Sequence, residues 1–356
     1  MRSRRRVSTL KAAPAFAVLL LPACGLLDDD QDLTRRAEQA LSEHRVADAI
    51  PDLNSALQKN PANVAARVAL ARARIESGDF QVAAEALKQA VAAGATAAAT
   101  APLNCRLAQE QGQSAEALKA CEPASDLPER IRADMLASQA GATLASGDLA
   151  RAETLANAAL RLDPQSARSH LALALAIVSA KGVEAAGPSF AKAISLNPND
   201  PRAPLAQGQA LATAGNLKGA EQSFRDAIGA ARRYQHGFAR LVAYTYLVDV
   251  LLRQDETTQA LATAAELVDW SPNNTLALRT QGRALLTAGK ASEARTVLEK
   301  AVAGAPGDGA ARVLLSLAHE KLGNGQQAEA QLTALVAQDP GSAFGRRALA
   351  ELRLRS

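Results

Sequence analysis

Aromatic residues, histidine and the short motifs typical of enzymes are all scarce in this sequence. Aromatic residues make up only 3 % of the 356 residues, a share that suits many thin helix–helix contacts better than one large core. The four histidines, His44, His170, His236 and His319, show no spacing typical of zinc ligands. A GxSxG elbow, a Walker loop and a dinucleotide fingerprint are absent too. We therefore predict a non-catalytic protein without metal or cofactor. The alternative is a catalytic triad whose residues lie far apart in the sequence and are brought together by folding.

Long apolar runs and strand-like alternation are also missing. The longest apolar run, over residues 12–21, holds ten or so residues, whereas a helix that spans a bilayer needs roughly 20. Five bases precede or adjoin that run: Arg2, Arg4, Arg5, Arg6 and Lys11. A short apolar segment after a basic one is typical of a cleavable signal peptide, which we place at residues 1–23.

The cysteine that follows this segment predicts a membrane anchor. Residues 21–24, Leu-Pro-Ala-Cys, resemble the bacterial lipobox, although Pro22 departs from it, and the resemblance implies that Cys24 is lipidated. Gly25 follows instead of Asp, which by similarity to Gram-negative sorting rules implies the periplasmic face of the outer membrane. Residues 24–32 then form a short tether. The alternatives are an ordinary cysteine in an ordinary signal peptide and export by the twin-arginine route.

Net charge gives no support for binding nucleic acid. The chain carries 40 Lys plus Arg against 36 Asp plus Glu, for a net charge of +4. The predicted signal peptide holds five bases and no acids, so the mature chain has a net charge of −1. Nucleic-acid binding calls for a basic patch on the folded domain itself. The expected partners are other proteins and, through Cys24, the membrane, whereas the oligomeric state stays open.

Prolines recur at a fixed interval along the remainder of the chain. Residues 167–198 have the pattern of two antiparallel helices whose small side chains let the backbones approach closely. Proline tolerates the place where one such helix pair ends and the next begins. Thirty-four residues separate Pro164 from Pro198, Pro272 from Pro306, and Pro306 from Pro340. This spacing resembles the tetratricopeptide repeat, a helix–turn–helix unit of about 34 residues.

The resemblance implies an all-α, right-handed superhelical solenoid of about nine such units. Repeats one to six occupy residues 33–231, and repeats seven to nine occupy residues 241–342. Pro198 and Pro272 are 74 residues apart, about six more than two repeats need, so we expect an insertion or lengthened helix at residues 232–240. Residues 343–356 look like the capping helix that closes such an array.

The first repeats carry a closer resemblance. Residues 49–95 resemble the opening of tetratricopeptide lipoproteins found beside PEP-CTERM/exosortase and exopolysaccharide gene clusters. The resemblance implies a scaffold that binds components of an envelope or exopolysaccharide secretion machine. The alternatives are an assembly chaperone for a pilin or outer-membrane protein, and a carbohydrate-binding or processing factor.

Two features of the middle repeats each allow two interpretations. Cys105 and Cys121 are equidistant from Gln113, so antiparallel helices would place them at one level. They would form a disulfide in an oxidising compartment if their Cα atoms lie within about 7 Å, and otherwise they are two small buried thiols. Trp270 is either an anchor for a partner or plain packing.

The family resemblance also implies where a partner binds. The first helix of each pair would line the concave face, and arginine dominates the positions expected there. Guanidinium groups bind oxyanions with two hydrogen bonds, which suits a peptide carboxylate or an anionic saccharide. The alternative is that these arginines only keep an exposed face soluble. The predicted groove residues are Arg72, Arg168, Arg202, Gln209, Asp249, Arg279 and Arg283.

Overall fold

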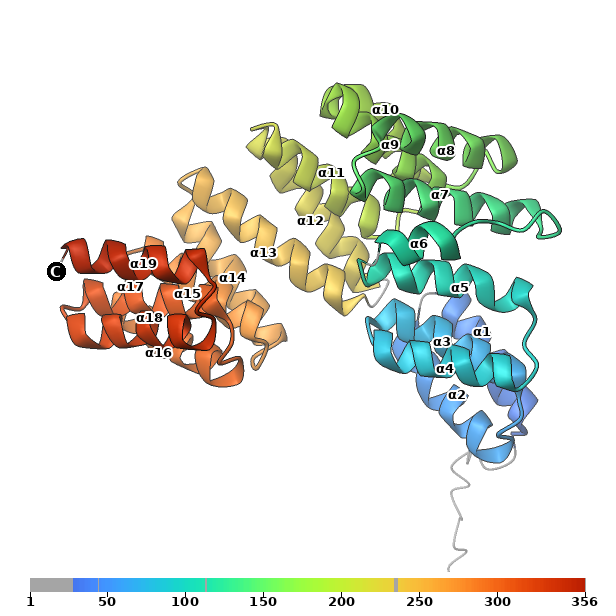
Figure 1. Ribbon diagram of the computed structural model, residues 1–356, viewed down its shortest axis with the longest axis horizontal. Coiled ribbons are helices and arrows are strands. Elements are labelled where there is room, and N and C mark those ends of the chain that lie inside the picture. Colours follow the sequence, from blue (N-terminus) through green and yellow to red (C-terminus); the bar gives the residue numbers. More distant parts are fainter. Residues whose placement is uncertain (1–27, 44, 113, 234–235, 356) are drawn as a thin grey trace, which may run out of the picture.

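The computed structural model describes residues 28–43, 45–112, 114–233 and 236–355, and these residues form α-helices joined by short turns (Figure 1). The predicted signal peptide and Cys24 lie outside the described residues. Among the helices described, none has the length and apolar content needed to cross a membrane. The helices are α1 (Asp30–Ser42), α2 (Val46–Lys59), α3 (Val64–Ser77), α4 (Phe80–Ala92), α5 (Ala97–Glu110), α6 (Ser114–Ala120), α7 (Glu129–Ala145), α8 (Leu149–Leu162), α9 (Ala167–Lys181), α10 (Val183–Leu196), α11 (Arg202–Thr213), α12 (Leu217–Arg233), α13 (Gly237–Arg253), α14 (Thr257–Trp270), α15 (Thr275–Thr287), α16 (Ala291–Gly304), α17 (Gly309–Lys321), α18 (Gly325–Gln338) and α19 (Ala343–Arg355).

A capping side chain two residues after a proline marks the start of several odd-numbered helices. At α15, the Asn274 side chain accepts hydrogen bonds from the backbone N–H groups of Leu276 and Ala277, which satisfies donors that have no partner inside the helix. The proline interval of 34 residues is therefore the interval between helix starts. Equivalent pairs are Pro61 with Asn63, Pro164 with Ser166, and Pro306 with Asp308.

The helices pack as nine antiparallel pairs followed by α19, which confirms the predicted helical solenoid. Each odd-numbered helix contacts its even-numbered partner and also the next odd-numbered helix along the chain. The odd-numbered helices therefore line one continuous face, which we call the inner face. Figure 1 shows the pairs stacked side by side from α1 to α19 along a curved path.

Small residues hold the two helices of a pair close together. In the pair α9/α10, Ala174 and Ala186 are fully buried around Phe190, and in the pair α15/α16, Ala284 and Ala294 are fully buried as well. Many short contacts of this kind replace a single large core. The largest apolar cluster runs from α11 to α15 and includes Phe224, Tyr244 and Leu267.

One element boundary differs from the sequence prediction, and the described part of residues 232–240 agrees with the lengthened helix that the sequence allowed. Helix α1 begins at Asp30, inside the predicted tether, because the Asp29 carboxylate caps it by accepting a hydrogen bond from the Asp32 backbone N–H at 2.7 Å. Most of the predicted insertion at 232–240 is helical, since α12 continues to Arg233 and α13 begins at Gly237.

Trp270 contacts the start of α13 and stays 37 % exposed, so the packing and anchor interpretations both remain open. The Arg240 guanidinium lies 4.2 Å from the centroid of the Trp270 ring, within the range of a cation–π contact. Trp270 ends α14, an even-numbered helix, so it contributes to the repeat junction rather than to the inner face.

Candidate binding face

The predicted groove residues all lie on odd-numbered helices, and the structure gathers most of them into two hollows of the inner face. Arg72, Arg168 and Arg202 line the first hollow, together with Arg106, which sequence analysis missed. Arg279 and Arg283 line the second. Gln209, on α11, is half-buried and lines neither hollow.

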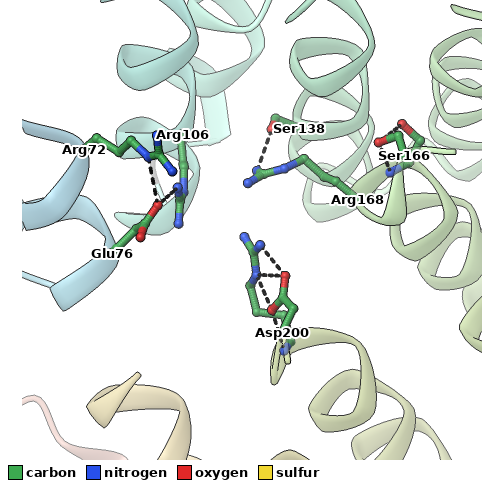
Figure 2. A network of polar contacts seen from close by, with 9 residues as sticks. Arg72, Glu76, Arg106, Ser138, Ser166, Arg168 and Asp200 are labelled. Atoms are coloured by element: carbon green, nitrogen blue, oxygen red, sulfur yellow. Dashed lines mark hydrogen bonds and ion pairs between the residues drawn. The ribbon is translucent and has the colours of Figure 1, made fainter. Parts of the chain in front are cut away.

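The first hollow, which we call the arginine pocket, lies between α3, α5, α7, α9 and α11. It consists of two adjoining cavities of about 180 Å³ and 270 Å³ that share Ser138 and Arg168 in their walls. Figure 2 shows the side chains of Arg106 and Arg168 extending toward each other from opposite sides, with Asp200 below them.

Glu76 neutralises one side of the arginine pocket. It is 4 % exposed, and its Oε1 accepts hydrogen bonds from Arg106 Nη1 at 3.1 Å and from Arg72 Nε at 3.4 Å. Burial acts to raise the pKa of the Glu76 carboxyl, but Arg106 and Arg72 outweigh burial and hold the pKa below its usual range. The acid is therefore ionised and links α3 to α5.

Asp200 neutralises Arg202 at the opposite side. The Asp200 carboxylate accepts hydrogen bonds from Arg202 Nε at 2.9 Å and from Arg202 Nη2 at 2.5 Å. Burial acts to raise the pKa of Asp200, but the charge and hydrogen bonds of Arg202 hold it well below its ordinary value. This two-pronged pair fixes both side chains just before α11 begins.

Arg168 differs from its neighbours because it has no carboxylate partner among the described residues. Its Nη1 donates a hydrogen bond to Ser138 Oγ at 3.4 Å, and it forms no ion pair within the described chain. Burial, together with the nearby Arg202 and Arg106, lowers the pKa of Arg168 to about 10. Asp134 and Asp200 favour the charged form and offset part of this effect, so Arg168 is charged at neutral pH.

The second hollow, which we call the apolar groove, lies on α13, α15, α17 and α19. Its volume is about 330 Å³. Ion pairs occupy both of its arginines: Arg279 Nη1 lies 2.7 Å from Asp308 Oδ2, and Arg283 Nη1 lies 2.8 Å from Asp249 Oδ1. Its apolar lining consists of Leu276, Ala310, Val313, Leu314 and Phe344, the last 56 % exposed.

Comparison with known proteins agrees with this architecture. Two sequence models of the tetratricopeptide repeat match the chain, one at residues 40–101 and 285–352. The other matches residues 138–201, 171–235 and 246–309. The chain belongs to the tetratricopeptide repeat family. No curated protein matches this tetratricopeptide chain in sequence.

Solved tetratricopeptide structures share the fold at low identity. PilW, a type IV pilus biogenesis factor, is 20 % identical with a TM-score of 0.50, over 62 % of this chain and 98 % of its own. Cut9–Hcn1 of the APC/C is 13 % identical with a TM-score of 0.54, over 93 % of this chain and 57 % of its own. PilF of Pseudomonas aeruginosa is 19 % identical with a TM-score of 0.49, over 64 % of this chain and 99 % of its own. The likeness to these structures is one of fold.

Acidic side chains pair with most of the arginines that the sequence predicts for the groove. Of the five arginines predicted from sequence, Arg168 alone has no carboxylate partner among the described residues. The set predicted from sequence contains Asp249, the partner of Arg283, but lacks the partners of the other three paired arginines, which are Glu76, Asp200 and Asp308. A signal exists, since three of the ion pairs join residues 29 to 34 positions apart, about one tetratricopeptide repeat.

Cys105 and Cys121 are joined by a disulfide in the structure, with their Cα atoms 4.6 Å apart. The bond ties α5 to the residue that follows the seven-residue helix α6. Cys105 also lines the arginine pocket next to Arg106. The disulfide therefore holds the part of α5 that presents Arg106.

No cluster of three potential metal-binding side chains occurs within the described ranges. His319 is nearly buried on α17, and His236 caps α13, its Nδ1 accepting a hydrogen bond from the Ala239 backbone N–H at 3.2 Å. The side chains that line the arginine pocket and the apolar groove can bind a partner through apolar contact and ion pairing.

Proposed function

We propose that this chain is a non-catalytic scaffold that binds a partner protein of a cell-envelope machine along its inner face. The observation that carries the proposal is the apolar groove. Its apolar side chains are half-buried or exposed and share the groove with two arginines whose charges are cancelled in ion pairs, so the groove suits an apolar segment of a protein. Since the solenoid is already formed, only the partner would have to become ordered on binding.

The envelope location rests on the sequence of the N-terminus. The basic and apolar segments before Cys24 suit export, and lipidation of Cys24 would hold the solenoid at the periplasmic face of the outer membrane. A single acyl chain gives only marginal anchoring, so several chains are needed. We expect a Cys24→Ser variant to appear in the soluble periplasmic fraction instead of the membrane fraction.

Two kinds of envelope partner follow from different observations. The first repeats resemble lipoproteins of exopolysaccharide systems, which favours a secretion component as the partner. The fold likeness to PilW, a type IV pilus biogenesis factor, favours an assembly role for a pilin or outer-membrane protein. Binding of an acidic polysaccharide is less well supported, because acids already neutralise most of the inner-face arginines.

The test is capture of a partner from detergent-solubilised envelopes by the intact protein and by two variants. Phe344→Asp places a charge in the apolar groove. Leu354→Asp places the same charge on the same helix, at a side chain that is 87 % exposed and outside the groove.

We expect one defined protein to bind the intact protein and Leu354→Asp, to resist high salt, and to bind Phe344→Asp at least about 10-fold more weakly. Circular dichroism checks that both variants keep their helices. Equal capture by both variants would show that the apolar groove is not the binding site. Capture of a polysaccharide that salt elutes, instead of a protein, would show that the partner is a saccharide.

A further inference from the structure

We infer that the open face of α19 pairs with α19 of a second copy of this chain, in antiparallel orientation, and so joins two solenoids at their α19 ends. The inference goes beyond the proposed function, because it concerns contact between copies and not contact with the partner protein. Four exposed side chains carry it, since they form a self-complementary stripe along α19. They are Phe344, Arg347, Glu351 and Leu354.

Helix α19 leaves part of its surface without a neighbour. Among the described helices its substantial contacts are with α17 and α18, and its buried residues are Gly345 and Leu352. The end of a helical array stays soluble when its outer face is polar. Helix α1 meets this condition, because each of its exposed residues is polar or charged. Helix α19 instead exposes two large apolar side chains, Phe344 at 56 % and Leu354 at 87 %.

The four exposed side chains lie along one side of α19. Positions 344, 347, 351 and 354 are separated by three, four and three residues, and a helix has about 3.6 residues per turn. This is the spacing of the a and d positions along the seam of a coiled coil. Arg347 and Glu351, whose side chains are 81 % and 48 % exposed, form an ion pair with Nε 2.7 Å from Oε1. The order along the stripe is therefore apolar, basic, acidic, apolar.

This order is complementary to itself when the second helix runs in the opposite direction. Antiparallel pairing centred on Leu349 places Phe344 opposite Leu354 of the second copy, and Arg347 opposite Glu351 of the second copy. Each contact then occurs twice, because a two-fold axis relates the copies. A parallel pair in register would instead place Arg347 against Arg347 and Glu351 against Glu351, and like charges repel.

The other arginines of α19 are engaged within their own copy. Arg353 Nη2 lies 2.6 Å from Glu329 Oε1, and Arg355 Nε lies 3.1 Å from Glu320 Oε1. Arg346 Nη1 donates a hydrogen bond to a backbone carbonyl oxygen six residues before it, at 2.8 Å. The charges that face a second copy are therefore those of the stripe, which carries one base and one acid.

The experiment measures the mass of the full chain by sedimentation velocity in detergent. The concentration runs from about 10 µM to about 1 mM, because one helix face is smaller than the roughly 1,200–2,000 Å² of stable interfaces and should give a weak dimer. Two variants, Arg347→Glu and Glu351→Arg, each reverse one charge of the stripe. The control, Arg225→Glu, alters an exposed arginine of α12 that pairs with Glu221 at the same four-residue spacing.

We expect the unaltered chain and Arg225→Glu to change from monomer to dimer over this range. Arg347→Glu and Glu351→Arg should each dimerise at least about 10-fold more weakly, because each places like charges opposite one another at two contacts. An equimolar mixture of these two variants should regain dimers, since each facing pair then has opposite charges. Recovery in the mixture also shows that both variants are folded.

Three results would overturn the inference: a monomer at the highest concentration, equal dimerisation of both charge-reversal variants and the unaltered chain, or a mixture no more dimeric than its components. Phe344 also lines the apolar groove, and the charge-reversal variants leave it unaltered. The capture test compares Phe344→Asp with Leu354→Asp, and both changes alter the stripe. A difference in capture between them therefore reports on the apolar groove alone, so failure of one proposal is distinct from failure of the other.

Discussion

Asp200 keeps two arginines of the pocket close together without strong repulsion. It is 9 % exposed, and besides the Arg202 guanidinium it accepts a hydrogen bond from the Arg202 backbone N–H at 3.0 Å. Without its negative charge, Arg202 would face the positive charge of Arg168 in a poorly solvated place. Removing one partner of a buried ion pair is more costly than the net worth of the pair itself.

The Asp200→Asn change should therefore lower the free energy of unfolding at pH 7 by about 3 kcal/mol. The pKa of Asp200 is lowered in the folded protein, so its contribution is present above the unfolded value of about 3.9 and is lost as the pH falls through the lower folded value. Thermal unfolding measures this effect. The difference in stability between Asp200→Asn and the unaltered protein should be largest at pH 7 and should shrink as the solution becomes acidic.

Asp269→Asn, at an exposed acid of α14, is the control and should change stability by less than about 0.5 kcal/mol. A loss that does not depend on pH would contradict this account.

At the scale of helices, the two members of a pair approach most closely where glycine replaces a larger residue. In the pair α15/α16, a Cβ atom added at Gly282 would lie 2.5 Å from both Cγ and Cδ2 of Leu298. Leu298 is fully buried, so it has little room to move. The α11/α12 pair has the same arrangement, with Gly208 lying against Phe224.

We predict opposite effects for two glycine-to-alanine changes within helices. Gly282→Ala should lower the free energy of unfolding by about 1–3 kcal/mol through overpacking. Gly229→Ala, on α12, meets only the Arg233 side chain at 3.6 Å, so it should raise stability by up to about 1 kcal/mol through helix propensity. Urea unfolding followed by circular dichroism measures both. If Gly282→Ala were also stabilising, the close approach of α15 and α16 would not be tight in solution.

The sequence predicts the helix pairs well because each boundary has a local cause. Prolines, capping side chains and turn glycines such as Gly289, with φ of +75°, act within a few residues of themselves. The extension of α12 to Arg233 has no such local cause. Ala230 and Ala231 are almost completely buried, so tertiary packing extends α12 past the usual repeat length. The ion pairs of the inner face likewise depend on side-chain directions across neighbouring repeats, which the sequence indicates only by spacing.

For the whole molecule, every substantial contact between described helices joins elements one or two positions apart in chain order. Stability in such an array is approximately a sum of the stabilities of the repeats and of their interfaces. A weak repeat can therefore open without unfolding distant ones. The third pair is the weakest by inspection, since α6 has only seven residues, whereas the largest apolar cluster surrounds α13.

Reduction of the Cys105–Cys121 bond should consequently have a local effect. Its 16-residue separation corresponds to about 3 kcal/mol in the chain-entropy model, so amide hydrogen exchange in α5 and α6 should accelerate by up to about 100-fold in the presence of a dithiol. Exchange in α13 to α16 should not change, because those helices share no contact with the third pair.

A variant with both Cys105→Ala and Cys121→Ala is the control and should show the faster exchange with or without the dithiol. Acceleration along the whole chain would mean that the solenoid unfolds as one unit, and no acceleration anywhere would mean that the two cysteines are not bonded or contribute nothing to α5.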